Sequence, residues 1–259
     1  NKNKIVLPNP MSVDKSVIRA TLIPSLLNIY DYNKARKVTD VCIYEISKTY
    51  DTNLMEDTKV SALMKGNYLV NNWQNLRVKV DFYLVKGIVE NLLDYLGLKN
   101  RYSFVVDTIP DLHPGISAKI ILDREEIGVI GRVHPSLKKD EIYVFELSMN
   151  KLIKQIKPLK YKEASKYPSI TKDMAFIVKK DVSSNDIQSI IKKVGGRLLT
   201  DIDVFDVYVG ENVGDDEKSI AYTLTFSDPT RTLSDEEVTQ LFRQIIEKVE
   251  QTGAKLRDK

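Results

Sequence analysis

The alternation of apolar and polar positions is most regular after residue 169. Four strands are predicted there, at residues 173–178, 199–209, 218–226 and 254–257. Ser184 is expected to cap a helix after the first strand, and Ser234 with Glu237 forms a capping box that begins a second helix before the last strand. The resulting order of elements, βαββαβ, is that of a ferredoxin-like domain, which we place at residues 169–259.

The first 150 residues show a less regular mixture of helical and strand patterns. A helix is expected to begin near Pro24, and a second helix, which Asp81 caps, is expected to end at Gly97. Five strands are predicted, at residues 39–47, 102–106, 117–122, 127–133 and 143–147. Glu125 and Glu126 suggest a hairpin turn between two of them. The pattern therefore predicts an α+β protein, with a mainly antiparallel sheet and flanking helices in residues 1–150.

A lysine-rich segment separates the two parts. Lysines recur between residues 151 and 162, and Pro158 and Pro168 interrupt any regular element. We expect a short helix followed by an extended linker over residues 151–168. The pattern leaves open whether this segment is a solvated tether or a strip that binds phosphates.

Each strand of the second domain has an apolar side and a polar side, because strand side chains alternate. We expect the apolar sides to meet the two helices; they are Met174, Phe176 and Val178, then Phe205, Val207 and Val209, then Ile220, Tyr222, Leu224 and Phe226. The opposite side, on which we also place Val204, is small and polar apart from one exposed aromatic. Four of its residues are candidates for ligand contact, namely Ala175, Asp206, Tyr208 and Ser219.

This polar side has the chemistry of a surface that reads a base of single-stranded RNA. Tyr208 can stack on a base, which contributes about 1–3 kcal/mol. Asp206 can accept hydrogen bonds from the donor edge of guanine, and Ser219 can donate or accept. Open four-stranded sheets commonly bind single-stranded RNA in this way. A plain solvated face, or a face that another domain covers, is the alternative that the pattern leaves open.

Basic residues around this side are candidate phosphate contacts, although scattered surface charge is the alternative. The four candidates are Lys172, Arg197, Lys218 and Arg231. The whole chain has a net charge of +3, but residues 165–259 contain 14 Lys and Arg against 17 Asp and Glu. Charge alone therefore does not select nucleic acid as the partner.

The composition makes several kinds of chemistry improbable. The single cysteine, Cys42, excludes an internal disulfide and a multi-cysteine zinc site, and we expect it to be a small buried residue. The two histidines both precede proline, and no phosphate-cradling glycine loop occurs. We therefore expect no catalytic residue and no metal ligand in this chain. No run of about 18 apolar residues is present, so no membrane span is expected, and the composition fits a cytoplasmic protein.

Several motifs, in register along the whole chain, resemble the β chain of bacterial phenylalanyl-tRNA synthetase. They are Asn9-Pro10-Met11-Ser12, Leu22-Ile23-Pro24-Ser25-Leu26-Leu27, Asp81-Phe82-Tyr83-Leu84-Val85-Lys86-Gly87, Gly131-Arg132-Val133-His134-Pro135, Lys166-Tyr167-Pro168-Ser169, Phe205-Asp206-Val207-Tyr208 and Asp228-Pro229-Thr230-Arg231-Thr232-Leu233. The family's β chain is much longer, so this chain looks like its C-terminal third. Residues 1–150 then resemble part of a class II synthetase-like, non-catalytic module, and residues 169–259 resemble the ferredoxin-fold anticodon-binding domain.

Two departures from an active class II core support a non-catalytic role for residues 1–150. The strand around Glu45 has no arginine beside the glutamate, where an active enzyme holds the ATP α-phosphate. The segment after Arg132 runs into His134-Pro135 and cannot continue as a helix. The resemblance therefore implies that ATP and phenylalanine bind on a catalytic α chain, and that the family's magnesium ligands belong to β-chain modules upstream of this portion.

The resemblance also implies the partners and the site. An α₂β₂ phenylalanine–tRNA ligase would bind tRNA(Phe), with its first anticodon base, a guanine, held at the positions that match Ala175, Asp206, Tyr208 and Ser219. Two alternatives remain at this stage. One is a free-standing RNA-binding protein with a ferredoxin-like sheet, and the other is an amino-acid-sensing module of the same fold.

Overall fold

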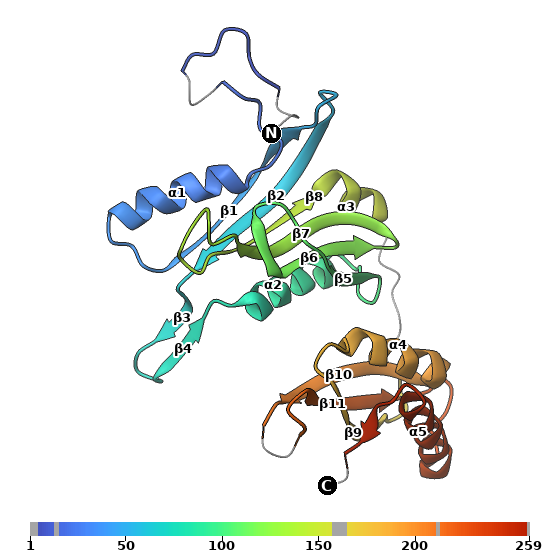
Figure 1. The fold of residues 1–259 in the computed structure, drawn as a ribbon. Coiled ribbons are helices and arrows are strands. Elements are labelled where there is room, and N and C mark those ends of the chain that lie inside the picture. Colours follow the sequence, from blue (N-terminus) through green and yellow to red (C-terminus); the bar gives the residue numbers. More distant parts are fainter. Residues whose placement is uncertain (1–4, 13–15, 157–164, 211–212, 258–259) are drawn as a thin grey trace. The chain divides into compact units, whose positions relative to one another are not determined.

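The computed structural model describes residues 5–12, 16–156, 165–210 and 213–257. The chain divides into two compact units, Asn1–Leu159 and Lys160–Lys259 (Figure 1). The residues between 157 and 164, where the extended linker is predicted, lie outside the described part. None of the helices that the structure describes is both long and apolar enough to cross a membrane.

The first unit is built on a six-stranded antiparallel sheet with the strand order β1-β2-β8-β7-β6-β5. Its strands are β1 (Val41–Tyr50), β2 (Glu56–Lys65), β5 (Tyr102–Val106), β6 (Leu112–Leu122), β7 (Glu125–Val133) and β8 (Tyr143–Ser148). A separate hairpin consists of β3 (Asn67–Asn71) and β4 (Leu76–Lys79). Three helices, α1 (Ile23–Ala35), α2 (Phe82–Tyr95) and α3 (Met149–Gln155), complete the unit.

Strand β2 shows how the two faces of this sheet are covered. Leu63 belongs to a core cluster with Leu26 and Tyr30 of α1, whereas its neighbours Ala62 and Met64 belong to a second cluster with the buried residues of α2. Successive strand residues point to opposite faces. Helices α1 and α2 therefore cover opposite faces of the sheet.

The caps predicted for the helices of this unit are mostly present. The Asp81 carboxylate accepts a 2.7 Å hydrogen bond from the Leu84 amide, as an N-cap does. Gly97 follows α2 with φ of +76°, a conformation that glycine adopts at low cost. Helix α3 confirms the short helix predicted at the start of the lysine-rich segment, and its Leu152 is fully buried in this unit.

Two expectations for the first unit were wrong, and three of its strands, β2, β3 and β4, were not predicted. The hairpin between β6 and β7 turns at Asp123-Arg124, both with positive φ, and not at Glu125-Glu126, which pair within the strands. Cys42 is exposed, because β1 is an edge strand of the sheet and α2 does not extend over it. Strand β2, which alternation did not reveal, is enclosed on both faces.

The second unit has the predicted ferredoxin-like order. It comprises β9 (Ile170–Lys179), α4 (Ser184–Gly195), a short 3₁₀ turn, β10 (Leu199–Tyr208), β11 (Glu217–Phe226), α5 (Asp235–Glu250) and β12 (Lys255–Leu256). The strands are ordered β10-β11-β9-β12 and all neighbours are antiparallel. Strand β11 thus separates β9 from β10, as a split βαβ arrangement requires.

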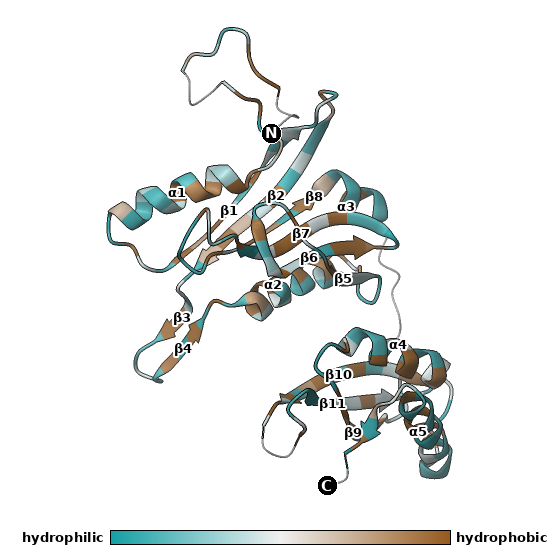
Figure 2. Ribbon diagram, viewed as in Figure 1, coloured by the Kyte–Doolittle hydropathy of each residue, from teal (hydrophilic) through white to brown (hydrophobic). Residues whose placement is uncertain are grey.

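The two helices of this unit begin at capped residues and pack on one face of the sheet. Ser234 accepts a 3.2 Å bond from the Glu237 amide, which confirms the predicted cap of α5. Helix α4 is capped by Ser183 rather than Ser184; the Ser184 hydroxyl lies 3.2 Å from the buried Tyr222 hydroxyl. Burial raises the pKa of Tyr222 to about 12. Hydrophilic and hydrophobic positions alternate along the helices in Figure 2.

The core predicted from β9 and β11 is confirmed, but the prediction for β10 was wrong. Phe205, Val207 and Val209 are more than half exposed, whereas Ile202 and Val204 pack against the core. A β-bulge between Val204 and Asp206 changes the phase of the strand. Strand β10 is also an edge strand of the sheet.

Candidate RNA-binding face

The sheet of the second unit has one face that α4 and α5 do not cover, which we call the open face. Directly paired residues of neighbouring antiparallel strands project to the same side, so the register defines rows across this face. One row consists of Asp206, Ala221 and Ala175, and the next consists of Tyr208, Ser219, Ile177 and Lys255. All four candidate residues therefore lie in two adjacent rows of the open face.

The four residues differ in how accessible they are. Asp206 is exposed, and Tyr208 and Ala175 are half-buried. Ala221, between Asp206 and Ala175, is small, so that a flat base can approach the sheet closely. Ser219 is only 2% exposed, so a base can reach its hydroxyl only after a neighbour has moved.

Tyr208 is held by contacts on two sides. Its hydroxyl lies against Gly210, where the Cβ of any other residue would overlap it. The guanidinium carbon of Arg257 lies 5.3 Å from the centroid of its ring, within the range of a cation–π contact. The Arg257 amide donates a 2.8 Å bond to the Ala175 carbonyl, which extends the Asp206 row to Arg257.

Arg257 and Lys255 were not among the cations expected at this face. Both belong to the short last strand that the pattern predicts, and they are two residues apart, so they share a side. The signal was therefore present in the sequence. To assign Lys255 and Arg257 to the open face, one must also know that β12 pairs with β9, with Lys255 opposite Ile177.

Two of the four expected phosphate contacts lie on the side of the sheet that faces the helices. Lys172 pairs with Leu224 and Lys218 pairs with Val178, both core residues. The Lys172 ammonium group forms a 2.9 Å ion pair with Asp235 of α5. Lys218 donates a 2.8 Å bond to the Lys180 carbonyl.

The other two expected contacts, Arg197 and Arg231, gather around Asp228. Asp228 is 2% exposed, and one of its carboxylate oxygens, Oδ2, lies 3.5 Å from Arg197 and 3.9 Å from Arg231. The other oxygen accepts bonds from the Thr230 hydroxyl and amide, at 2.6 and 2.9 Å, and these bonds hold the pKa of Asp228 below its usual range. Arg231 also forms a two-bond ion pair with Glu237.

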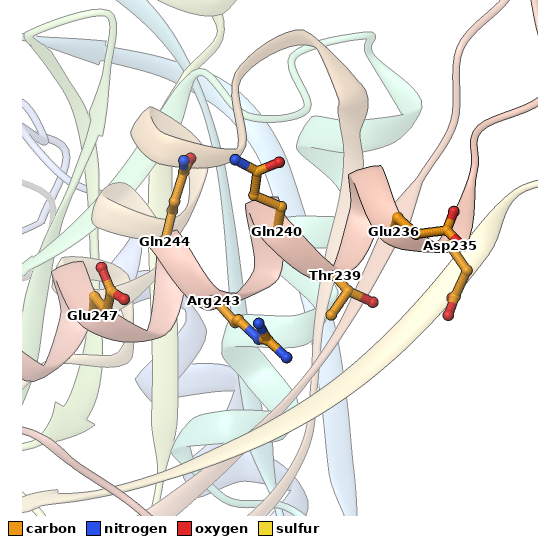
Figure 3. A pocket seen from close by; sticks show the side chains of 7 residues that line it. All are labelled: Asp235, Glu236, Thr239, Gln240, Arg243, Gln244 and Glu247. Carbon is orange, nitrogen blue, oxygen red and sulfur yellow. The ribbon is translucent and has the colours of Figure 1, made fainter.

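The outer side of α5 presents a second polar surface, shown in Figure 3. Asp235, Glu236, Gln240, Arg243 and Glu247 project from this single helix. The helix packs on the covered face of the sheet, so this surface and the open face belong to opposite layers of the unit. It brings together none of the four candidate residues.

The first unit holds its charged strand residues in structural contacts. Arg19, from the segment before α1, donates 2.8 Å to Glu45 of β1 and 3.1 Å to the Lys48 carbonyl. Glu146 is buried in β8, where it binds Lys59 at 2.9 Å and the Leu22 amide at 2.7 Å. Among the residues that the structure describes, no three His, Cys, Asp or Glu side chains form a group that could hold a metal ion.

The second unit is thus a ferredoxin-like domain with an uncovered sheet face that carries an aromatic ring, a carboxylate and small residues, features typical of RNA-binding modules. Family models identify the chain further. Residues 1–149 match the model described as phenylalanyl tRNA synthetase beta chain CLM domain, and residues 165–257 match the ferredoxin-fold anticodon binding domain. The chain belongs to the phenylalanyl-tRNA synthetase beta chain family.

Curated relatives agree with this assignment. The chain is 40% identical over 257 residues to the phenylalanine–tRNA ligase beta subunit of Bacillus subtilis (strain 168), an alignment that covers 95% of this chain and 32% of the relative. It is 36% identical to the beta subunits of Listeria monocytogenes (serovar 1/2a) and Geobacillus kaustophilus, over 97% and 98% of this chain and 32% and 33% of those relatives. The chain therefore spans about a third of the length of these relatives.

Proposed function

We propose that this chain is the portion of a phenylalanine–tRNA ligase beta subunit that binds the anticodon of tRNA(Phe), in the cytoplasm. The observation that carries the proposal is the placement of Ala175, Asp206, Tyr208 and Ser219 in two adjacent rows of the open face. Family membership favours this function over a free-standing RNA-binding protein or an amino-acid sensor.

The base-reading mechanism follows from the chemistry of the two rows. Tyr208 offers its ring to the face of the first anticodon base, and Ala175 and Ala221 leave room for the base beside it. The Asp206 carboxylate accepts from the N1–H and N2–H₂ groups of guanine, donors that adenine does not present in this pattern. The carboxylate thereby favours guanine over adenine at this position, because base contacts carry the sequence information.

The chemical step belongs to another chain in this proposal. The first unit keeps its strand charges in ion pairs such as Arg19–Glu45 and Lys59–Glu146. A catalytic alpha chain, in an α₂β₂ assembly, would bind ATP and phenylalanine. The role of the first unit would be to support that assembly as a class II-like module.

The test uses the complete beta subunit purified with its alpha chain. Asp206→Ala and Tyr208→Ala should slow charging of tRNA(Phe) and leave ATP–pyrophosphate exchange with phenylalanine unchanged. Full charging rates in both variants would refute the role of the open face. If ATP–pyrophosphate exchange were lost as well, the variants would disturb the whole assembly.

A further inference from the structure

The charges on the open face are distributed unevenly between its two edges. Strand β10, at one edge, contributes Asp201, Asp203 and Asp206, which pair with Thr225, Thr223 and Ala221. Asp173 adds a fourth carboxylate, and it accepts a 2.7 Å bond from Thr223. An RNA backbone that crossed this half of the face would meet several carboxylates.

Cations occupy the other side of the same face. Lys179 of β9 pairs with Glu217, which places it on the side of Ser219 and Ala221. Lys255 of β12 pairs with Ile177, in the row of Tyr208. Lys179 and Lys255 are therefore diagonal neighbours across β9 and β12, about 7–8 Å apart at the backbone.

Both lysines are accessible to a ligand. Lys179 is exposed, and the Lys255 side chain is 73% exposed. The Glu217 carboxylate lies 3.8 Å from the Lys255 ammonium group. A pair of that length at the surface is weak, so a phosphate can replace the carboxylate.

The distance across the sheet fits one nucleotide. Three strand spacings separate β10 from β12, which is about 14 Å. A nucleotide whose phosphate lies over β12 can extend its base across Ala175 and Ala221 toward Asp206. The opposite orientation would place the phosphate among the aspartates of β10.

We propose that Lys179 and Lys255 bind the phosphates next to the base that the open face reads, so that the RNA backbone follows the β9–β12 side. This inference rests on the proposed function and specifies the strand path at the same site. It also reassigns the phosphate contacts from Lys172 and Lys218, which face the helices, to two lysines on the open face.

The test compares Lys179→Gln and Lys255→Gln with Lys172→Gln and Lys218→Gln, the matched lysines of the opposite side. Each variant is made in the complete beta subunit with its alpha chain, and the Kd for tRNA(Phe) is measured at several salt concentrations. Lys179→Gln and Lys255→Gln should each weaken binding about two- to fivefold and lower the salt slope by about 0.7. The preference for guanine at the first anticodon position should be unchanged, because phosphate contacts carry no base information.

The outcomes separate the inference from the proposed function. Unchanged salt slopes in Lys179→Gln and Lys255→Gln would overturn the inference, as would equal losses in Lys172→Gln and Lys218→Gln. If Asp206→Ala then still impairs charging, only the strand path is wrong. If Asp206→Ala has no effect either, the open face does not bind the anticodon at all.

Discussion

Arg257 and Tyr208 are in contact across the open face, although they lie on strands at opposite edges of the sheet. The guanidinium carbon of Arg257 is 5.3 Å from the centroid of the Tyr208 ring. Ala175 and Ala221, which lie in the row of Arg257 next to that of Tyr208, are small and leave room for the long arginine side chain. A base that stacks on Tyr208 must therefore share this space with Arg257 or displace it.

The first prediction concerns the ring of Tyr208. Tyr208→Ala removes the stacking surface and should weaken tRNA(Phe) binding by about 1–3 kcal/mol, whereas Tyr208→Phe should retain most of the affinity. Filter binding with the complete holoenzyme measures both. Equal losses in the two variants would mean that the hydroxyl, and not the ring, makes the important contact.

The second prediction concerns Gly210, which the Tyr208 hydroxyl touches. A methyl group in Gly210→Ala would displace the ring, so this variant should lose part of the affinity that Tyr208→Ala loses. In the Tyr208→Ala background the same change should have little further effect, because neighbouring sites are coupled. A double-mutant cycle on the Kd for tRNA(Phe) measures the coupling, and additive losses would contradict the contact.

The third prediction concerns the buried ion pair of the first unit. Glu146 is 6% exposed and accepts from Lys59, Thr21 and the Leu22 amide. Glu146→Ala leaves these donors unpaired and should lower the free energy of unfolding by about 3 kcal/mol. Hydrogen exchange of the β8 amides at increasing urea concentrations measures the change, and Glu45→Ala at a half-exposed pair should cost less.

The fourth prediction concerns the stability of the second unit at acidic pH. The bonds from Thr230 lower the pKa of Asp228, so its contribution to stability is complete above pH ~4, the ordinary carboxyl range. It should be lost as the pH falls through the lowered pKa. Hydrogen exchange of the β11 amides between pH 6 and 3 measures this, once corrected for the intrinsic exchange rate. In Asp228→Asn the loss of protection of the β11 amides between pH 6 and 3 should be smaller. An identical pH profile in this variant would mean that other carboxylates cause the loss.

The sequence predicted most of the second unit because its sheet is covered on one face only. Met174, Phe176 and Val178 are buried on one side, whereas Asp173, Ala175 and Ile177 lie on the other and are less buried, so the alternation identifies the buried side of the strand. Strand β10 was the exception. A bulge inserts one residue between Val204 and Asp206, and no pattern of apolar positions in an edge strand reveals such an insertion.

The first unit was harder to predict for a related reason. Strand β2 is covered on both faces, so its apolar residues do not alternate, and Lys59 and Ser61 interrupt them because they bind Glu146 and the Phe145 carbonyl. Predicting which cations lie on the open face depended on knowing how the strands pair. Lys172 and Lys179 are seven residues apart on one strand, so alternation places them on opposite sides, and the register with β11 shows that Lys179 is the one on the side of Ser219.

The most direct test of the account is discrimination at the first anticodon base. The ratio of kcat/KM for tRNA(Phe) with guanine to that with adenine at this position should be measured for the holoenzyme and for Asp206→Asn. We predict that Asp206→Asn reduces the ratio about 5- to 150-fold, with most of the loss on the guanine tRNA, because one bidentate base contact is worth about 1–3 kcal/mol. An unchanged ratio would contradict the claim that the open face reads this base.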